Sequence, residues 1–214
     1  MSHNVTAHAS LAGLPFLPEL RLYQAGAEVG LWTHSGGAYA SDRPPPFWAF
    51  AWAGGQGLAR YVLDHPDLVA GRRVLDLAAG SGLIAVAAAR AGAAQVTATD
   101  VDDDALDAIR LNAEANGVAV GTARLDLLDP AAHAAADEHD VVLAGDVFYT
   151  EALAGRARAF LRRAARAGAL VLVGDARRGY LPERLFTEVA AYDVPVPRAL
   201  EETRRKRAMV YRLT

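Results

Sequence analysis

The chain of 214 residues contains no cysteine and only two methionines. The lack of cysteine excludes disulfides, thiolate metal sites and a cysteine nucleophile, so the fold must depend on its hydrophobic core. No apolar run reaches the roughly 18 residues that a membrane span needs, because Arg90 interrupts the Ala-rich stretch at residues 83–94. Residues 1–22 have no basic segment ahead of a continuous apolar one, so no secretory signal is expected. The cytoplasm is therefore the expected location.

A large excess of one sign of charge is also lacking, since 22 Lys and Arg against 25 Asp and Glu give a formal net charge of −3 at pH 7. An average surface of this kind offers no long-range attraction to nucleic acid or to an anionic membrane. The basic run at residues 204–207 follows two glutamates, and we interpret it as the solvated edge of a hairpin. We therefore expect neither a nucleic acid nor a membrane as partner.

The hydrophobic fraction of 52% and the chain length are sufficient for one well-cored domain and short for two. We expect a single domain over residues 1–214. Residues 1–43 show no steady hydrophobic period and are interpreted as an N-terminal lid of short elements, while residues 44–214 form the core. Prolines 44–46 stop any helix, and an aromatic cluster at residues 47–52 leads into a helix at residues 56–63.

From residue 72 onward, short apolar runs alternate with longer amphipathic ones. The pattern predicts strands at residues 72–77, 95–99, 121–125, 141–145 and 169–173, and helices at residues 82–91, 103–116, 150–167 and 181–190. Residues 191–196 and 206–213 are expected to form a hairpin, which would make the last strand antiparallel. This alternation predicts an α/β fold with a doubly wound, Rossmann-like sheet of seven strands, covered on both faces and binding ligands at the carboxyl ends of its strands.

A glycine turn follows the first of these strands, in the segment VLDLAAGSG at residues 74–82. At Gly80 and Gly82 the missing Cβ permits a positive φ and lets backbone come close to a ligand. The next strand ends at Asp100, a carboxylate that suits the hydroxyls of a ribose. The sequence therefore predicts a site for a nucleotide-like molecule.

Two chemistries fit this turn. The run from Gly80 also matches the G-x-G-x-x-A dinucleotide pattern, with Asp100 at the expected distance of about 20 residues. Asp76 argues against a pyrophosphate, because a carboxylate just before the turn would repel it. A cofactor with a cation and no phosphates, such as S-adenosylmethionine, suits Asp76 better. The pattern D-L-x-x-G-x-G resembles motif I of class I S-adenosylmethionine-dependent methyltransferases; a structural glycine turn in an unrelated protein is the alternative.

Acidic residues follow the second and third strands. Asp102, Asp103 and Asp104 lie where a helix begins, and we interpret them as capping residues. In methyltransferases the place of Asp126 and Leu127 commonly holds the adenine, which the resemblance implies here. Asp129 is an alternative for that role, or both acids are turn formers ahead of the following proline.

The segment DVFY at residues 146–149 follows the fourth strand, where a methyl acceptor would lie. It resembles the post-II motif of the seven-β-strand protein methyltransferases that modify lysine. With PPFWAFAWAGGQ at residues 45–56 and Gly174-Asp175, the chain is similar to the electron transfer flavoprotein beta-subunit lysine methyltransferase family from about residue 43 to 178. The chain departs from the family at Ala79, where relatives often carry Ser or Gly, and at residues 176–180, which replace a Pro-Gly-Arg-like turn.

The resemblance implies a lysine methyltransferase with S-adenosylmethionine as cofactor, S-adenosylhomocysteine as product and the flavoprotein beta subunit as protein substrate. Asp146 and Tyr149 are the catalytic candidates, Asp175 a further substrate contact. In the alternative interpretation, Asp146 caps the helix near Thr150 and Tyr149 packs in the core. The cofactor residues are expected to be Trp52, Asp76, Ala78, Ala79, Gly80, Ser81, Gly82, Asp100, Val101, Asp126, Leu127 and Gly145.

Methyl transfer from a sulfonium is a direct displacement, so the task is to position a neutral amine, and no metal is needed. Three other functions remain open. A small-molecule N- or O-methyltransferase would share the cofactor residues and differ only at the acceptor end. A nicotinamide-dependent reductase is disfavoured by Asp76 and by the lack of a Tyr-x-x-x-Lys pair. A non-catalytic cofactor-binding protein is the third.

Overall fold

The structure is a computed structural model that describes residues 5–6, 9–25, 46–132, 138–196 and 203–214. Its strands are β1 (Ser10–Leu14), β2 (Leu17–Gln24), β3 (Arg73–Leu77), β4 (Gln95–Asp100), β5 (Gly121–Arg124), β6 (Val141–Gly145), β7 (Leu170–Asp175), β8 (Phe186–Pro195) and β9 (Arg205–Leu213). Its helices are α2 (Ala53–Asp64), α3 (Leu83–Arg90), α4 (Asp103–Ala115) and α5 (Glu151–Arg166), with short 3-10 turns η1 (Phe47–Ala49), η2 (Pro66–Leu68) and η4 (Glu183–Leu185).

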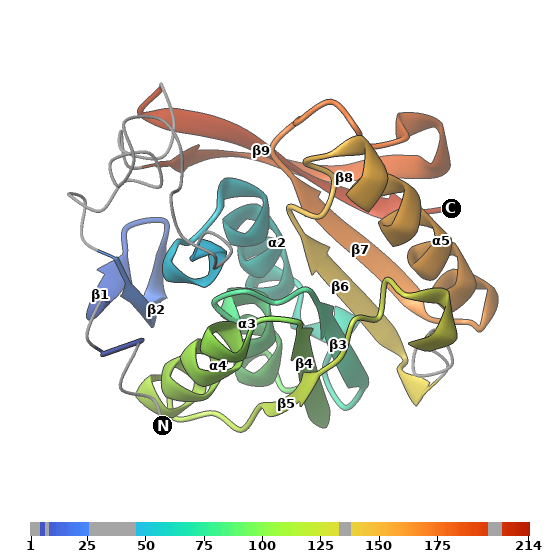
Figure 1. The fold of residues 1–214 in the computed structure, drawn as a ribbon. Helices are drawn as coiled ribbons and strands as arrows, with labels where there is room; N and C mark the ends of the chain where they lie inside the picture. Colours follow the sequence, from blue (N-terminus) through green and yellow to red (C-terminus); the bar gives the residue numbers. More distant parts are fainter. Residues whose placement is uncertain (1–4, 7–8, 26–45, 133–137, 197–202) are drawn as a thin grey trace.

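A seven-stranded sheet in the order β5-β4-β3-β6-β7-β9-β8 forms the centre of the molecule (Figure 1). Strands β3 to β7 pair in parallel, with Leu75 of β3 opposite Thr97 on one side and Val142 on the other. β9 runs antiparallel to both β7 and β8. The predicted α/β fold with an antiparallel last strand is confirmed.

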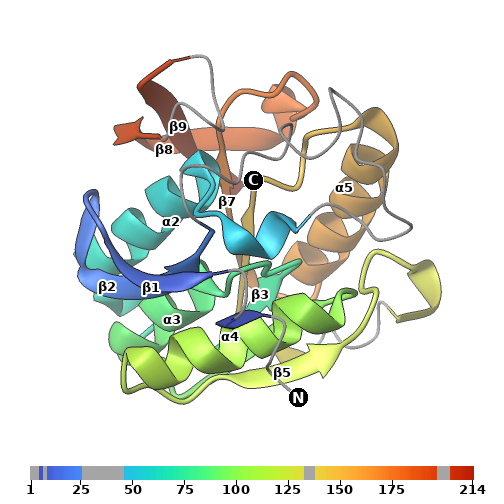
Figure 2. The same ribbon diagram turned by 60° about the vertical axis from the view of Figure 1, so that its left-hand side comes forward.

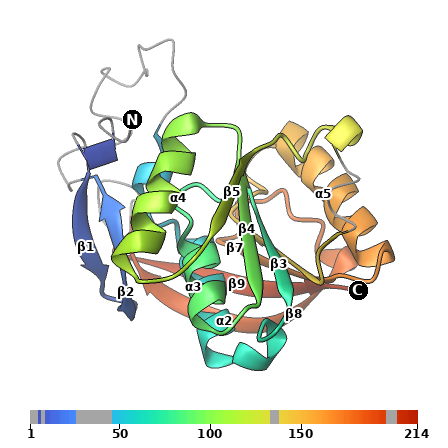
Figure 3. The ribbon, with the colours of Figure 1, turned by 90° about the horizontal axis from the view of Figure 1, so that it is seen from below.

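Helices cover both faces of this sheet. α5 packs on one face, where Phe160 and Leu161 join Leu75, Val142 and Val171 in a buried cluster. α2 and α3 pack on the other face over the alternate residues of the same strands. Figure 3 shows α4 and α5 on opposite sides of the strands. Strands buried on both faces explain the continuous apolar runs in the sequence.

The N-terminal hairpin β1–β2 forms a separate two-stranded antiparallel sheet outside the helical layer (Figure 2). Its buried side chains, Leu14, Leu17, Leu20 and Leu22, pack against α2, α3 and α4. The hairpin is also held by hydrogen bonds from the backbone N–H of Tyr23 to Asn112 Oδ1 (2.7 Å) and of Arg21 to Asn116 Oδ1 (3.0 Å). Residues 1–4, 7–8 and 26–43 of the expected lid lie outside the described residues, so a lid function stays a prediction.

The helix predicted at residues 181–190 is wrong, because the chain forms η4 there and then enters β8. Glu188, Ala190 and Ala191 favour a helix by intrinsic propensity. A register shift between Glu188 and Ala190 breaks the two-residue period that would have revealed a strand. Pairing with β9 overrides the local preference, as tertiary contacts commonly do.

α5 shows how a strongly charged segment still packs well. Thr150 Oγ1 accepts a hydrogen bond from the N–H of Leu153 (3.3 Å), and Arg163 and Arg166 lie in the last turn, where cations suit the helix dipole. Its buried stripe carries only apolar residues, and the arginines face outward. Within the described parts of the chain, no helix has the length and apolarity required to cross a membrane.

Candidate functional site

The candidate site lies at the carboxyl ends of β3, β4, β6 and β7. Chain order reverses between β3 and β6, which are hydrogen-bonded neighbours, and this is where doubly wound folds bind ligands. Each of the four strands carries an aspartate at or near this end: Asp76, Asp100, Asp146 and Asp175. The sheet thus brings together acids that are distant in the sequence.

The glycine turn after β3 adopts the left-handed conformation three times, at Ala78 (φ 53°), Gly80 (φ 53°) and Gly82 (φ 73°). A Cβ on Gly80 would meet nothing nearer than the Cα of Trp48, at 3.9 Å. A Cβ on Gly82 would lie 2.9 Å from Cγ1 of Ile109. Gly80 therefore leaves room beside the turn, whereas Gly82 is required by packing against α4 as well as by its positive φ.

Asp76 is fully buried and holds the start of α3. Its Oδ2 accepts a hydrogen bond from the N–H of Ala85 (2.9 Å), while Gly82, the residue before the helix, has no side chain to do so. Oδ1 of Asp76 is buried without a hydrogen-bond partner. Burial raises the pKa of Asp76 to about 8, helped by the negative charge of Asp100 and opposed by the Ala85 hydrogen bond.

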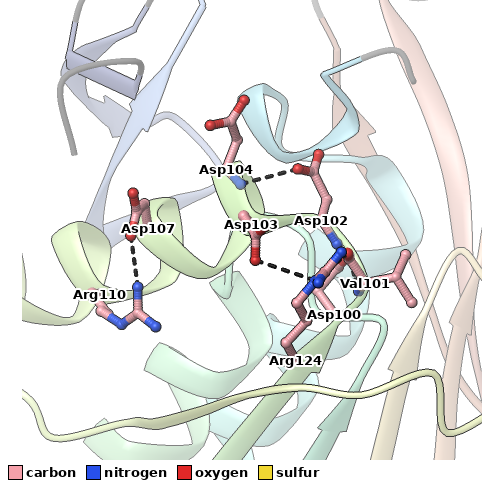
Figure 4. A network of polar contacts seen from close by, with 8 residues as sticks. All are labelled: Asp100, Val101, Asp102, Asp103, Asp104, Asp107, Arg110 and Arg124. Atoms are coloured by element: carbon pink, nitrogen blue, oxygen red, sulfur yellow. Dashed lines mark hydrogen bonds and ion pairs between the residues drawn. The ribbon is translucent and has the colours of Figure 1, made fainter. Parts of the chain in front are cut away.

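Asp100 joins the end of β4 to the glycine turn. Its Oδ2 accepts a hydrogen bond from Gly80 N–H (2.9 Å), and its Oδ1 accepts from Val101 N–H (2.8 Å) and Asp102 N–H (3.1 Å). Figure 4 shows Asp100 and its neighbours at the start of α4. Since a carboxylate offers about four lone-pair positions, Asp100 retains capacity for a ligand hydroxyl.

The acids that follow Asp100 belong to the helix, as predicted. Asp102 Oδ1 accepts a hydrogen bond from Asp104 N–H (3.0 Å), and Asp103 forms an ion pair with Arg124 of β5 (3.2 Å, Figure 4). Val101 is 56% exposed beside them.

Asp126 and Asp129 both stabilise the turn after β5. Asp126 Oδ1 accepts from Leu128 N–H (3.1 Å), and Asp129 Oδ1 accepts from Ala131 N–H (2.9 Å). Oδ2 of Asp126 also accepts from Arg156 Nη2 (2.6 Å), and this arginine of α5 had no assigned role in the sequence analysis. Leu127 is buried. The contacts are those of turn formers, one of the alternatives that the sequence left open, and the adenine role of Asp126 and Leu127 stays a prediction.

Asp146 caps a helix, but it is α2 and not the helix that follows it. Its Oδ2 accepts a hydrogen bond from the N–H of Gly55 (2.8 Å) in the first turn of α2, where Trp52 provides no side-chain cap. α5 has its own cap in Thr150. Asp146 has a φ of 53°, and its backbone N–H donates to the carbonyl oxygen of Gly174 (2.8 Å). The strained residue is thus fixed between β7 and α2.

Glycines allow this close packing of α2 on β6 and β7. A Cβ on Gly54 would lie 2.6 Å from Asp146 Oδ2, and one on Gly145 would lie 2.6 Å from Cδ1 of Ile84. A Cβ on Gly174 would overlap the carbonyl oxygen of Gly54. The Gly-Gly pair of the aromatic motif and the aspartate of DVFY are therefore parts of one contact.

The second oxygen of Asp146 faces a cation. Nε of Arg178 lies 3.6 Å from Oδ1, too far for a hydrogen bond but close enough for an ion pair, and the aspartate side chain is only 10% exposed. Burial raises the pKa of Asp146 to about 6, against the lowering effects of Arg178 and of the Gly55 N–H. Sequence reasoning missed Arg178, because only the fold brings the turn after β7 to Asp146.

Aromatic side chains line the same region. The Trp52 indole donates a hydrogen bond from Nε1 to the carbonyl oxygen of Phe47 (3.0 Å), and the Phe47 and Tyr149 rings lie 5.9 Å apart. Tyr149 is 44% exposed, so it is not a core residue, which was the alternative interpretation. Partial burial and the negative charge of Asp100 raise the pKa of Tyr149, so the two side chains lie within electrostatic reach of each other.

Asp175 ends β7 and is almost fully buried. Its Oδ1 accepts hydrogen bonds from the backbone N–H groups of Arg177 (2.6 Å) and Arg178 (3.3 Å), and its Oδ2 has no hydrogen-bond partner. Arg177 has a φ of 57°, the conformation that glycine favours. Asp175 thus shapes the turn that carries Arg178.

A sequence profile described as ribosomal protein L11 methyltransferase (PrmA) matches residues 61–163. The Xenopus laevis electron transfer flavoprotein beta subunit lysine methyltransferase is 35% identical over 175 residues, which cover 81% of this chain and 69% of that protein. The Caenorhabditis elegans homologue is 32% identical, covering 80% and 74% respectively. The match to the Danio rerio protein has 38% identity over 71% of this chain and spans 60% of the length of that relative.

Solved structures share the fold. TrmN from Thermus thermophilus is 28% identical, with a TM-score of 0.55, and the match covers 83% of this chain and 56% of TrmN. SMU.776, solved in complex with SAH, has a TM-score of 0.55 at 15% identity and covers 76% of this chain and 50% of its own. At 15% identity, the SMU.776 match supports the fold alone.

Proposed function

The chain belongs to the electron transfer flavoprotein beta subunit lysine methyltransferase family, and on this basis we propose that it methylates a lysine of that flavoprotein subunit with S-adenosylmethionine as methyl donor. The observation that carries the proposal is the position of Asp146. Its buried carboxylate is paired through Oδ1 with Arg178, whose guanidinium lies over the Trp52 ring, and Phe47 packs against both Trp52 and Tyr149. Oδ1 accepts no hydrogen bond within the fold. We also propose that the protein is cytoplasmic, as its sequence suggests.

The residues around the glycine turn fit this cofactor. Asp76 Oδ1 is a buried oxygen without a hydrogen-bond partner, which suits the ammonium group of an amino acid, and such a cation would lower the pKa of Asp76 and favour its carboxylate form. The space beside Gly80 admits a ligand close to the backbone, and Asp100, which accepts three hydrogen bonds, has about one lone-pair position left for a ribose hydroxyl. When bound, S-adenosylmethionine would supply a methyl group on a sulfonium, whose sulfur leaves as a neutral thioether.

The chain's own residues prepare the acceptor. A lysine amine with a pKa near 10.4 arrives mostly as an ammonium, so it must be attracted, oriented and deprotonated before it reacts. Oδ1 of Asp146 would attract the ammonium and, once that group has released a proton to water, hold the neutral amine in line. Tyr149 and Phe47 would exclude water and contact the cation through their ring faces. Positioning of this kind supplies much of the rate enhancement of a displacement.

The test is methyl transfer from radiolabelled S-adenosylmethionine to recombinant electron transfer flavoprotein. Wild type is compared with Asp146→Asn, which keeps the Gly55 hydrogen bond and tolerates the positive φ. Asp193→Asn is the control, since Asp193 lies exposed on β8. We expect label on the beta subunit with wild type and Asp193→Asn, and a loss of at least about 100-fold with Asp146→Asn, the low end of what a positioned acid–base group contributes.

Cofactor affinity, measured by calorimetry on the same proteins, separates the parts of the proposal. We expect all three proteins to bind S-adenosylmethionine equally well. Binding without label on the flavoprotein would refute the substrate and leave the cofactor proposal standing. No binding to wild type would refute the methyltransferase proposal itself.

A further inference from the structure

Arg178 lies between the Asp146 carboxylate and the aromatic side chains of the candidate site. It lies in the turn after β7, and its side chain is only 24% exposed. Nε is 3.6 Å from Oδ1 of Asp146, and the guanidinium carbon is 5.4 Å from the centre of the Trp52 ring. A guanidinium at this distance over an indole is held by cation–π attraction as well as by its ion pair. One side chain thus contacts both the candidate acceptor carboxylate and the aromatic wall.

The backbone of this turn is fixed by the same strand end that fixes Asp146. Asp175 Oδ1 accepts the N–H groups of Arg177 and Arg178, and the preceding residue, Gly174, accepts the N–H of Asp146. The backbones of Arg178 and Asp146 are therefore held by hydrogen bonds to two adjacent residues of β7, Asp175 and Gly174. This arrangement leaves little freedom for the distance between guanidinium and carboxylate.

Arg178 is also the main cation that acts on Asp146. β7 and its turn contribute two charged groups, the positive Arg178 and the negative Asp175. α2 contributes the Gly55 N–H at its positive end, and α3 contributes the apolar side chain of Ile84 near Gly145. Burial and Asp175 favour the protonated acid, whereas Arg178 and Gly55 favour the carboxylate. With a pKa of about 6, Asp146 is ionised at neutral pH, but by a small margin.

We infer that Arg178 is a positioning residue for methyl transfer, which keeps Asp146 as a carboxylate with Oδ1 held on the side of Trp52. The inference rests on the proposed function, because it concerns the acceptor end of that same site. Without the cation, only the Gly55 N–H would oppose the effects of burial and of the Asp175 charge, and Asp146 would take up a proton at neutral pH. A protonated Asp146 neither attracts an ammonium nor accepts a hydrogen bond from the amine as strongly.

The direct test is a pH titration in which NMR follows the chemical shift of the Asp146 carboxyl carbon, in protein labelled at the aspartate side chains. The resonance is assigned by its loss in Asp146→Asn. Wild type is compared with Arg178→Met, which removes the charge, with Arg178→Lys, which keeps it, and with Arg158→Met, which removes an exposed arginine of α5. We expect the midpoint of the Asp146 titration to rise by about one pH unit or more in Arg178→Met. It should stay near the wild-type value in the other two variants.

The functional test is the pH dependence of kcat/KM for methyl transfer. We expect kcat/KM of Arg178→Met relative to wild type to be lower by about threefold or more at pH 6.5 and to approach the wild-type value near pH 9, where Asp146 is ionised in both proteins. Arg178→Lys should restore most of the loss. A ratio that is constant across pH would show a merely structural role and overturn the inference.

The NMR titration and the methylation assay test different parts of the account. An unmoved Asp146 midpoint in Arg178→Met overturns the inference, whether or not the flavoprotein is a substrate. A shifted midpoint with no methylation of the flavoprotein by wild type refutes the proposed substrate, while the electrostatic part of the inference stands. Equal losses in Arg178→Met and Arg178→Lys at every pH would also contradict it, because charge would then not matter.

Discussion

Two buried aspartates serve the fold and the candidate site at once. Asp76 and Asp146 each use Oδ2 to accept the N–H of the third residue of a helix, Ala85 in α3 and Gly55 in α2. Each leaves Oδ1 buried without a hydrogen-bond partner. The capping bond holds the carboxylate in place, and the remaining oxygen can face a cationic group, as Oδ1 of Asp146 faces Arg178. This division between the two oxygens separates structural from chemical roles within one side chain.

The capping role of Asp146 predicts a difference between two neutral substitutions. Asp146→Asn retains an acceptor for the Gly55 N–H, and Asn tolerates a φ of 53° better than most residues. Asp146→Ala loses both advantages. We expect the free energy of unfolding of the Asn variant to exceed that of the Ala variant by about 1 kcal/mol in urea denaturation at pH 7. Equal stabilities would contradict a capping role.

Some residues of the site could be identified from the sequence and others could not. Asp76, Asp100 and Asp146 were predictable because they follow apolar strands in a recognisable order, and the strand ends place them together. Arg178 and Arg156 could not be predicted, since their contacts depend on how turns and helices far apart in the chain meet. The local signals at these arginines are those of any solvated basic residue.

At the scale of elements, the start of α2 fits against the ends of β6 and β7 only because the contact contains no Cβ. Gly54, Gly145 and Gly174 all lie within it. The helix therefore brings its positive end directly to Asp146, and Trp52, the residue before the helix, contacts Arg178, the ion-pair partner of that carboxylate. Any side chain in this contact would move α2 and the site together.

Gly174→Ala tests this close packing. Its Cβ would overlap a backbone carbonyl oxygen of Gly54, which cannot turn aside as a flexible side chain can. We expect the free energy of unfolding to fall by about 2 kcal/mol or more, the upper part of the range for overpacking.

Gly155→Ala is the matched control for this variant. Gly155 lies exposed on α5, and a Cβ there would meet nothing within 4 Å. Thermal unfolding should show this variant more stable than wild type by about 0.5–1 kcal/mol, as for glycine in a helix interior. If both variants lost stability equally, the contact of α2 with β7 would not be the cause.

Elements whose apolar residues recur at a regular spacing were predictable from the sequence, whereas elements that depend on contacts with distant segments were not. β3, β4, β6 and β7 and the helices between them match the predicted ranges to within two residues, whereas α2, which precedes β3, begins at Ala53 and not at the predicted residue 56. β8 was mistaken for a helix because its bulge hides the strand period. The leucines of the hairpin β1–β2 pack against helices, a contact that no local sequence pattern predicts.

At the scale of the whole molecule, the parallel sheet collects buried acids at one edge, and this arrangement has a cost. Burial raises the pKa values of Asp76, Asp146 and Asp175 above their ordinary range. In each case the folded protein binds a proton more tightly than the unfolded chain does. The free energy of unfolding therefore falls as pH rises through the folded-state pKa, the reverse of the effect of a salt-bridged acid.

Asp76 gives this effect a defined window. Its pKa is about 8 in the folded protein against an ordinary value of 3.8, so the free energy of unfolding falls as pH rises from about 4 to about 8 and levels off above that. Relative to wild type, Asp76→Asn should remove a decrease of about 1.4 kcal/mol per pH unit over that interval. Urea denaturation at several pH values measures the two slopes. Parallel curves for the two proteins would contradict a proton held by Asp76.

The central claim is that Oδ1 of Asp146 meets the amine of a protein lysine. The most direct measurement is peptide mass spectrometry of the electron transfer flavoprotein beta subunit after incubation with S-adenosylmethionine and either wild type or Asp146→Asn. The account predicts methyl groups on lysine side chains with wild type and none above background with the variant. Unmodified lysines with wild type, or equal methylation by both proteins, would contradict it.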